Sequence, residues 1–182
     1  MQVSIILLSM FMMAFYTPTQ QELDFGKGKA GDNWYIINDG VMGGLSEGEG
    51  VLEANSLRFY GNVSLKNNGG FSSLRAPYQE MDLSGFETVE MRVRGKGQSF
   101  GFSMETSKLW FQPNYKVTFR PSPDEWEVMK FSLTDFNMYR IGQQMDQKIS
   151  QDALASIIRI GFITNDKKEG PFELEIDYIK FE

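Results

Sequence analysis

The sequence predicts an all-β protein, built as a sandwich or barrel of short strands. Three observations support this fold class: apolar and polar residues alternate in several segments, clusters of Gly, Pro, Asn and Asp separate those segments, and only one segment has the features of a helix. Alternation with a period of two is typical of a strand with one buried face, because successive side chains point to opposite sides of a sheet. Many short strands between turn residues are typical of sandwiches and barrels.

Seven segments have the pattern expected of strands. Apolar residues occupy every second position in most of them and nearly every position in residues 157–163. Gly61 is expected to form a β-bulge in the first segment, and either Tyr178 or Ile179 continues the apolar face of the last. The expected strands are residues 56–65, 88–95, 99–105, 115–120, 125–133, 157–163 and 172–181.

One short helix is expected at residues 150–156. Ser150 is a suitable N-cap, and Asp152 favours the first turn of a helix through its negative charge. Residues 134–149 are the longest stretch without a clear pattern and are expected to form a loop. Long loops on a rigid scaffold often carry function.

The composition is that of one ordinary globular domain. The chain has 182 residues, of which 41% are hydrophobic, 14% aromatic and 23% charged, and this length is enough to bury a sizeable core. The net charge is −6 and no run of Lys or Arg occurs. Nucleic acid is therefore not an expected partner.

The chain contains neither His nor Cys, and these absences narrow the chemistry. They exclude imidazole and thiol catalysis, disulfides, and metal sites that use imidazole or thiolate ligands. An enzyme would have to use carboxylates, Lys, Tyr or an activated Ser, and no motif predicts such a site. We therefore expect a protein that is not an enzyme and that has no transition metal or other cofactor.

The N-terminus resembles a secretory signal. Residues 3–16 are apolar except for two serines, which is typical of the hydrophobic region of a signal peptide and short for a membrane span. We expect a signal peptide at residues 1–20 and a single domain at residues 21–182, with a periplasmic or secreted location and membrane contact only before cleavage. An uncleaved anchor and a buried first strand are the alternatives.

Two glycine-rich segments, residues 34–46 and 61–75, share a pattern of apolar residues, then Asn or Asp, then glycines. Gly adopts positive φ without steric cost, and Asn or Asp can hold a turn by bonding the nearby backbone. We expect two tight loops that lock each other through an Asp39–Arg75 ion pair, with Trp34 and Met42 filling one end of the sandwich. The alternative is a polar rim around a cleft. The residues concerned are Trp34, Asn38, Asp39, Gly40, Met42, Gly43, Gly44, Ser46, Asn68, Gly69, Gly70 and Arg75.

The same segments carry a family resemblance. Trp, four residues, then Asp-Gly-Val-Met-Gly-Gly-x-Ser, followed by Gly-Gly-Phe-x-Ser-x-Arg, resembles the signature of the complex I intermediate-associated protein 30 family. The resemblance extends over roughly residues 23–182 and implies a galactose-binding-domain-like jelly roll of two antiparallel sheets. It also implies a non-enzymatic role, because the mitochondrial members of the family are assembly factors for respiratory complex I. Arg140-Ile141-Gly142 departs from the pattern, which has Arg directly before Gly.

Residues 108–115 form a second candidate surface. An exposed Trp or Tyr beside amide and guanidinium groups suits stacking against a sugar ring, and equally suits a protein-binding hot spot. A β-bend with one half-buried aromatic residue is the alternative. The candidate ligand-binding residues are Trp110, Gln112, Tyr115, Arg120 and Arg140.

The sequence leaves the ligand open. The first hypothesis is a protein-binding folding or assembly factor, and the alternative is a carbohydrate-binding module of the cell envelope. A carboxylate hydrolase is a third hypothesis without a supporting motif. A structural calcium ion held by Asp24 and Asp177, which lie near the two chain ends, is also compatible with the sequence.

Overall fold

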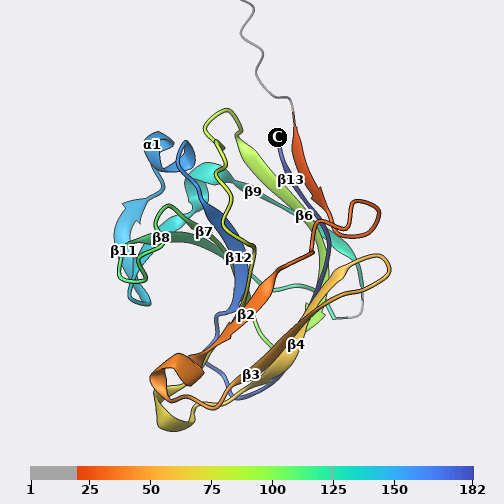
Figure 1. Cartoon of the computed structure of the whole chain (residues 1–182), viewed down its shortest axis with the longest axis vertical. Coiled ribbons are helices and arrows are strands. Elements are labelled where there is room, and N and C mark those ends of the chain that lie inside the picture. Colours follow the sequence, from red (N-terminus) through yellow and green to blue (C-terminus); the bar gives the residue numbers. More distant parts are fainter. Residues whose placement is uncertain (1–19, 124) are drawn as a thin grey trace, which may run out of the picture.

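The computed structural model describes residues 20–123 and 125–182, which form two antiparallel sheets packed face to face (Figure 1). The predicted all-β sandwich is therefore confirmed. The predicted signal peptide lies outside the described residues except for Gln20. No helix in the described part of the chain is long and apolar enough to cross a membrane.

The first sheet has six strands. Its order is β3-β4-β13-β6-β9, and β1 pairs with the C-terminal half of β13. The strands are β1 (Gln21–Asp24), β3 (Glu47–Leu52), β4 (Leu57–Val63), β6 (Thr88–Lys96), β9 (Glu127–Ser132) and β13 (Gly170–Phe181).

The second sheet has seven strands in the order β11-β10-β8-β7-β12-β5-β2. Figure 1 shows that this sheet is strongly curved and that the side turned away from the first sheet is concave. The strands are β2 (Tyr35–Asn38), β5 (Ser72–Arg75), β7 (Phe100–Glu105), β8 (Asn114–Phe119), β10 (Asn137–Arg140), β11 (Gln143–Lys148) and β12 (Arg159–Thr164).

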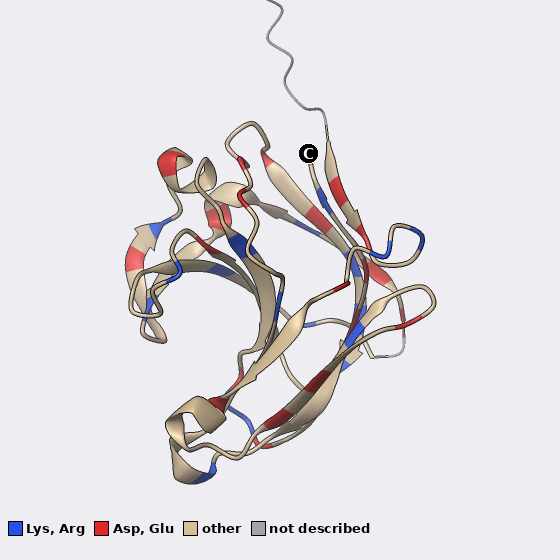
Figure 2. Cartoon of the chain, in the orientation of Figure 1, with Lys and Arg blue, Asp and Glu red and all other residues tan. Residues whose placement is uncertain are grey.

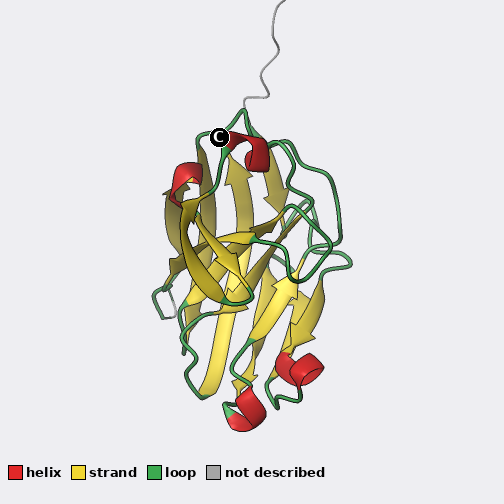
Figure 3. Ribbon diagram, turned by 90° about the vertical axis from the view of Figure 1, so that its left-hand side faces the viewer, coloured by secondary structure: helices red, strands yellow, loops and turns green. Residues whose placement is uncertain are grey.

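Four short helices connect the strands. The 3₁₀ helices η1 (Asp39–Met42) and η2 (Lys66–Asn68) lie at the end of the sandwich opposite the C-terminus (Figures 1 and 3). The other two are η3 (Leu133–Asp135) and α1 (Gln151–Leu154). The predicted helix is confirmed, and the Ser150 hydroxyl accepts a hydrogen bond from the Ala153 amide at 3.2 Å, as an N-cap should.

Aromatic side chains fill the space between the sheets. Phe59 of the first sheet packs against Phe172 with ring centres 4.8 Å apart, and Phe102 packs against Phe162 of the second sheet at 5.2 Å. These rings are almost completely buried. Such pairs contribute about 0.5–1.5 kcal/mol beyond the burial of their surface. Phe100 of the second sheet contacts both Phe59 and Phe172, with ring centres 6.3 and 6.2 Å apart, so the rings join the two sheets.

All seven predicted strands are present, but β1, β2, β3, β5, β10 and β11 were not predicted. Two predictions about individual segments are also wrong. Residues 134–149 form η3 and the β10–β11 hairpin instead of a loop. Every residue of β11 is exposed, because this edge strand has no face against the core. It therefore lacks the alternation from which strands are predicted.

The predicted bulge at Gly61 is also absent. Gly61 pairs regularly with Gly48 on one side and Phe172 on the other, and a Cβ there would lie 2.0 Å from the Glu47 carbonyl oxygen. The irregularity lies in β13, where the register shifts between Ile176 and Tyr178. This shift explains why Ile176 and Ile179 are both buried although they are three residues apart.

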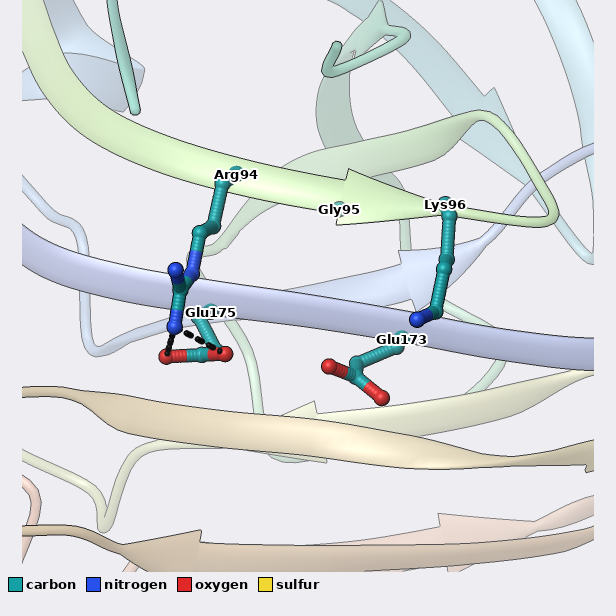
Figure 4. Close-up of a pocket in the computed structure, with 5 residues that line it drawn as sticks. All are labelled: Arg94, Gly95, Lys96, Glu173 and Glu175. Carbon is teal, nitrogen blue, oxygen red and sulfur yellow. Dashed lines mark hydrogen bonds and ion pairs between the residues drawn. The ribbon is translucent and has the colours of Figure 1, made fainter. Parts of the chain in front are cut away.

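The outer face of the first sheet is covered by charged pairs (Figure 2). Arg58 pairs with Glu173 at 3.0 Å and Arg94 with Glu175 at 2.8 Å, both across neighbouring strands. Figure 4 shows the shallow pocket of about 130 Å³ between these pairs, which Gly95 and Lys96 also line. Because its carboxylates already bind guanidinium groups, this pocket is part of a cross-strand charge ladder.

Candidate functional site

The concave face is the outer surface of the second sheet, and strand register shows which residues form it. Gly161 pairs with Arg75 on one side and Ser103 on the other, and Ser103 pairs with Lys116. Side chains in register point to the same side of a sheet. The concave face consists of Tyr35, Ile37, Ser73, Arg75, Gly101, Ser103, Glu105, Asn114, Lys116, Thr118, Asn137, Tyr139, Gln144, Arg159, Gly161 and Ile163, with Tyr78 and Asn165 in contact with it.

Arg159 is the centre of a polar network on this face. Its guanidinium donates two hydrogen bonds to Glu105 Oε2, one of them from Nε at 3.1 Å, and one to the hydroxyl of Tyr35. The ring of Tyr78 lies over it, 4.3 Å from Cζ. Arg159 is only 5% exposed although it lies on the outer side of the sheet. The two tyrosines therefore cover a guanidinium that is fixed by a carboxylate.

Arg75 binds the other oxygen of the same carboxylate. Its Nη1 lies 3.4 Å from Glu105 Oε1, and its Nε donates to Ser73 Oγ at 3.2 Å. Burial lowers the pKa of Arg75, the Glu105 charge opposes this effect, and the neighbouring Arg159 adds to it. Two guanidinium groups thus share one carboxylate, so this part of the face carries excess positive charge.

Lys116 adds a third cation. Its ammonium donates to Asn165 Oδ1 at 2.5 Å and lies 4.1 Å from the centre of the Tyr139 ring. The side chain passes over Gly101, where a Cβ would lie 2.3 Å from Lys116 Cδ. Among the described residues no carboxylate lies within ion-pair distance of Lys116, and burial lowers its pKa to about 8. A desolvated cation without a carboxylate partner is costly to the fold.

An apolar rim borders the concave face at the end where Glu105 and Asn114 lie. Trp110, in the turn between β7 and β8, is 78% exposed, and Phe111 beside it is also exposed. The Nε of Arg140 donates to the Phe111 carbonyl at 3.3 Å, which joins this turn to the β10–β11 hairpin. Gln112 is exposed in the same turn. Trp110, Gln112 and Arg140 are therefore brought together.

At the far end of the sandwich, Asp39 joins the two glycine-rich loops. Its buried carboxylate accepts hydrogen bonds from the Ser46 hydroxyl, the Ser46 amide at 2.9 Å, the Gly70 amide at 2.6 Å and the Phe71 amide at 3.2 Å. Burial alone would raise the pKa of Asp39, but these hydrogen bonds outweigh it, and the pKa lies below its ordinary value. The loops lock each other, as expected, but through Asp39 and backbone amides.

The predicted Asp39–Arg75 pair is wrong. Arg75 lies on the concave face and binds Glu105, whereas Asp39 is enclosed by the two loops. The prediction paired Asp39 with a cation across the two loops, although a turn Asp was also expected to bond the backbone beside it. The amides of the second loop satisfy the carboxylate instead, as they do at anion-binding turns.

The close approach of Asp39 explains two of the motif glycines. A Cβ on Gly44 would lie 2.3 Å from Asp39 Cγ, and one on Gly69 would lie 2.6 Å from Asp39 Oδ2. Trp34 packs edge-on against Phe25, with ring centres 5.4 Å apart, and contributes to one end of the core as expected. Met42 does not, since it is 64% exposed at the tip of η1.

The motif loops, the two sheets and their order can now be compared with known proteins. Residues 23–176 match the sequence profile of the complex I intermediate-associated protein 30 family. This chain belongs to that family. The resemblance inferred from the sequence is therefore confirmed.

Curated relatives carry the same name. Complex I intermediate-associated protein 30, mitochondrial, of Mus musculus is 28% identical over 170 residues, which cover 81% of this chain and 51% of the relative. The Drosophila melanogaster protein of that name is 27% identical over 107 residues, 56% of this chain and 36% of the relative. The chain thus spans about half or less of these relatives.

Solved structures share the fold. A family 11 carbohydrate-binding module from Clostridium thermocellum superimposes with a TM-score of 0.65 and 16% identity, covering 89% of this chain and 93% of the module. The same module in complex with a β-1,3-1,4-mixed-linked tetrasaccharide gives a TM-score of 0.63 at 18% identity, covering 89% and 94%. An agarase gives 0.58 at 12%, covering 90% of this chain and 24% of the agarase. Likeness at this identity shows the fold alone.

The expected periplasmic or secreted location is wrong for this member of the complex I intermediate-associated protein 30 family. The names of both curated relatives place them in mitochondria. An apolar N-terminal run suggested a secretory signal, but such a run does not by itself identify the compartment.

Two predicted ligand residues lie elsewhere in this family member. Tyr115 points into the core and is 7% exposed, because the turn before β8 places it opposite Met104 on the inner face. Arg120 follows the other end of β8 and pairs with Asp166 at 2.6 Å. Neither joins the surface formed by Trp110 and Arg140.

The two candidate calcium ligands both have protein partners. Asp24 accepts a hydrogen bond from the Lys27 amide at 2.8 Å, and Asp177 pairs with Arg92 at 2.5 Å. Pairing of β1 with β13 does bring Asp24 opposite Tyr178, beside Asp177, as expected. Within residues 20–123 and 125–182, no group of three or more acidic side chains is arranged to hold a metal ion.

Sequence reasoning missed the residues at the centre of the concave face. Arg159 stands within an apolar run, and Lys116 alternates with Tyr115 and Val117. Arg159 is a charged residue in an otherwise apolar strand, which was the available signal, whereas Lys116 occupies an ordinary polar position of an alternating strand. Their partners Glu105 and Asn165 are distant in the sequence, so the network itself could not be read from the chain.

Proposed function

We propose that this protein is a non-catalytic assembly factor that binds a protein partner on its concave face. The observation that carries the proposal is the network around Arg159, in which two tyrosines cover a fixed guanidinium on the outer side of a sheet. Tyr, Trp and Arg are the residues that concentrate in binding hot spots. Membership of a family named for association with complex I intermediates supports a protein as the ligand.

The chemistry of the face favours binding over catalysis. Glu105 is its central carboxylate, and both of its oxygens are engaged by guanidinium groups. A general acid or base needs a carboxyl group free to exchange a proton with the substrate. Glu105 lacks that freedom, so its role is to hold Arg75 and Arg159 in position.

A carbohydrate ligand is the second candidate, and the fold supports it. The similar module bound to a tetrasaccharide has the same sandwich. Tyr78 and Trp110 are exposed aromatic residues near the concave face, and the Asn114 and Gln144 amides lie among its polar groups. We rank this candidate second because fold similarity by itself is weak support for a shared ligand.

A cross-linking capture experiment with matched variants tests the proposal. Tyr78→Ala and Tyr139→Ala alter the concave face, whereas Tyr60→Ala alters the outer face of the first sheet, where Tyr60 bonds Glu49. Captured proteins from mitochondrial extract are identified and quantified for each variant. We expect complex I subunits or their assembly intermediates to be lost with the concave-face variants alone.

Two results would contradict this proposal. Equal capture by all variants would show that the concave face is not the binding surface. A glycan array on which the wild type binds neutral oligosaccharides, and the concave-face variants do not, would favour the carbohydrate candidate instead.

A further inference from the structure

We propose that the segment bound on the concave face is acidic: an extended peptide whose Asp or Glu side chains pair with Arg75 and Lys116. This inference rests on the proposed function, because it specifies the chemistry of the partner at the same surface. It follows from the charge balance of the face, from the way its cations are placed, and from the distance between them.

The charge balance is positive at the centre of the face. Arg75, Arg159 and Lys116 contribute three positive charges, and Glu105 is the one carboxylate that pairs with any of them among the described residues. The chain as a whole has a net charge of −6. A local excess of positive charge on an acidic protein attracts anionic ligands and orients their approach.

Two glycines allow these cations to lie flat on the sheet. The side chain of Arg75 lies against Gly161, where an added Cβ would be 3.4 Å from Arg75 Cγ, and Lys116 passes over Gly101. Both side chains therefore extend across the surface, with their charged ends on the outer side. Arg75 retains 26% side-chain exposure, so its guanidinium is accessible as well as desolvated.

The placement of these three cations destabilises the protein when no ligand is bound. Arg75 and Arg159 compete for one carboxylate, and the ammonium of Lys116 has an amide and an aromatic ring but no carboxylate. An incoming carboxylate would supply the missing counter-charge in a partly desolvated site, where such pairs are stronger than in water. The neutral sugar of the related module could not provide it.

The distance between Arg75 and Lys116 determines how far apart the carboxylates of the ligand must be. Arg75 and Lys116 lie in one row with Gly161 and Ser103 between them. Three strand spacings put their Cα atoms about 14 Å apart. An extended peptide advances about 3.3 Å per residue. Carboxylates about four residues apart span this distance and lie on the same side of the peptide, so they can reach both cations when the peptide crosses the strands.

Fluorescence anisotropy with a defined probe tests this inference. The probe is a labelled Gly-Ser peptide that carries two glutamates four residues apart, and its control carries glutamines. We expect the glutamate peptide to bind and the glutamine peptide not to bind. Arg75→Gln and Lys116→Gln should each weaken binding about tenfold, and so should raising the salt from about 0.05 M to about 0.5 M.

Matched controls separate local charge from net charge. Arg92→Gln and Lys130→Gln make the same changes on the first sheet, where these residues pair with Asp177 and Glu182. They should leave the affinity for the peptide unchanged. Equal weakening by all four variants, or absence of binding to the glutamate peptide, would overturn the inference. Tighter binding of an oligogalacturonate than of the peptide would also overturn it, in favour of an acidic glycan.

The inference and the proposed function can fail separately. If Tyr78→Ala abolishes capture of the partner but Arg75→Gln and Lys116→Gln do not, the concave face binds the partner through its aromatic residues and the acidic segment is wrong. If none of these variants affects capture, the proposed function itself fails.

Discussion

The Asp39 carboxylate accepts the Gly70 amide at 2.6 Å and thereby joins two loops that are 31 residues apart in the sequence. The same carboxylate binds Ser46 and Phe71, and it is fully buried. In a chain without disulfides, this single side chain fixes the end of the sandwich at which both motif loops lie.

Removing this carboxylate should destabilise the fold strongly. Asp39→Ala leaves the buried amides of Ser46 and Gly70 and the part-buried amide of Phe71 without their acceptor, and we expect the free energy of unfolding to fall by about 3–5 kcal/mol. Val41→Ser, at an exposed position of the same helix η1, should change it by less than about 0.5 kcal/mol. Urea denaturation of both variants checks this, and a small loss for Asp39→Ala would show that the loops are held by other contacts.

The same residue should contribute to acid denaturation. Its pKa in the folded protein lies below the ordinary value of 3.8. Asp39 therefore stabilises the fold above that value, and its contribution is lost as the pH falls through the lower, folded pKa. Stability curves of the wild type and Asp39→Asn should converge as the pH falls from 3.8 through the lower, folded pKa. Parallel curves down to the acid limit would contradict the lowered pKa.

Lys116 should give a pH dependence of the same direction at alkaline pH, although its charge destabilises the fold whereas that of Asp39 stabilises it. Its pKa is lowered from 10.5 to about 8, so between these values the unfolded chain binds more protons than the folded one. Stability should therefore rise as the pH increases from about 8 to about 10.5. The facing groups Tyr139 and Asn165 stay in place in Lys116→Met.

Lys116→Met should remove that rise and stabilise the protein at pH 7, because it replaces a desolvated ammonium by an apolar side chain of similar length. Thermal denaturation at several pH values measures both effects. A variant that is less stable than the wild type at pH 7 would show that the contacts with Asn165 and Tyr139 outweigh the desolvation.

The sequence predicted seven strands, each of six residues or more, because burial of one face imposes the alternation from which strands are recognised. It did not predict β1, β2 and β5, which have four residues each, or β3, which contains two glycines. It also did not predict β10 and β11, which form an edge hairpin whose outermost strand is exposed on both sides. Likewise, the loop residues of the family motif were identified correctly, but the partner of Asp39 was not. Backbone amides are present at every position, so the sequence does not mark the ones that a carboxylate will bind.

The candidate site was harder to predict than the fold, since it depends on which strands become neighbours. Arg159 and Glu105 lie 54 residues apart and meet because β12 pairs with β7. Tyr115 was misplaced for a related reason. Trp110 and Phe111 belong to the turn before β8 and not to the strand. The alternation of side chains in β8 therefore cannot be counted from Trp110, and it does not show whether Tyr115 points inward or outward.

Trp110 is exposed and Tyr115 is buried, and the stabilities of their alanine variants test these two placements. Tyr115→Ala creates a cavity in the core and should cost about 3–5 kcal/mol of stability. Trp110→Ala removes an exposed side chain and should change stability by less than about 0.5 kcal/mol. Thermal unfolding of the two variants gives the comparison. Similar losses would place Trp110 in a packed environment and exclude it from the exposed rim.

Glu105→Gln should separate stability from binding on the concave face. The substitution keeps the size of the side chain but removes the one charge that Arg75 and Arg159 share. Because Arg159 is buried, the two guanidinium groups then repel each other without compensation, and we expect a loss of about 3–5 kcal/mol in the free energy of unfolding.

The same variant should bind anions more tightly. With Glu105 neutral, the face gains one unit of positive charge, so the affinity for a glutamate peptide should rise while the fold weakens. Adding Arg159→Met to Glu105→Gln should recover part of the stability, since it removes the uncompensated buried cation, and a double-mutant cycle measures the coupling. Glu105→Gln could instead weaken both the fold and peptide binding. That result would show that the carboxylate acts by positioning Arg75. The geometry of the guanidinium would then matter more to the ligand than the net charge of the face.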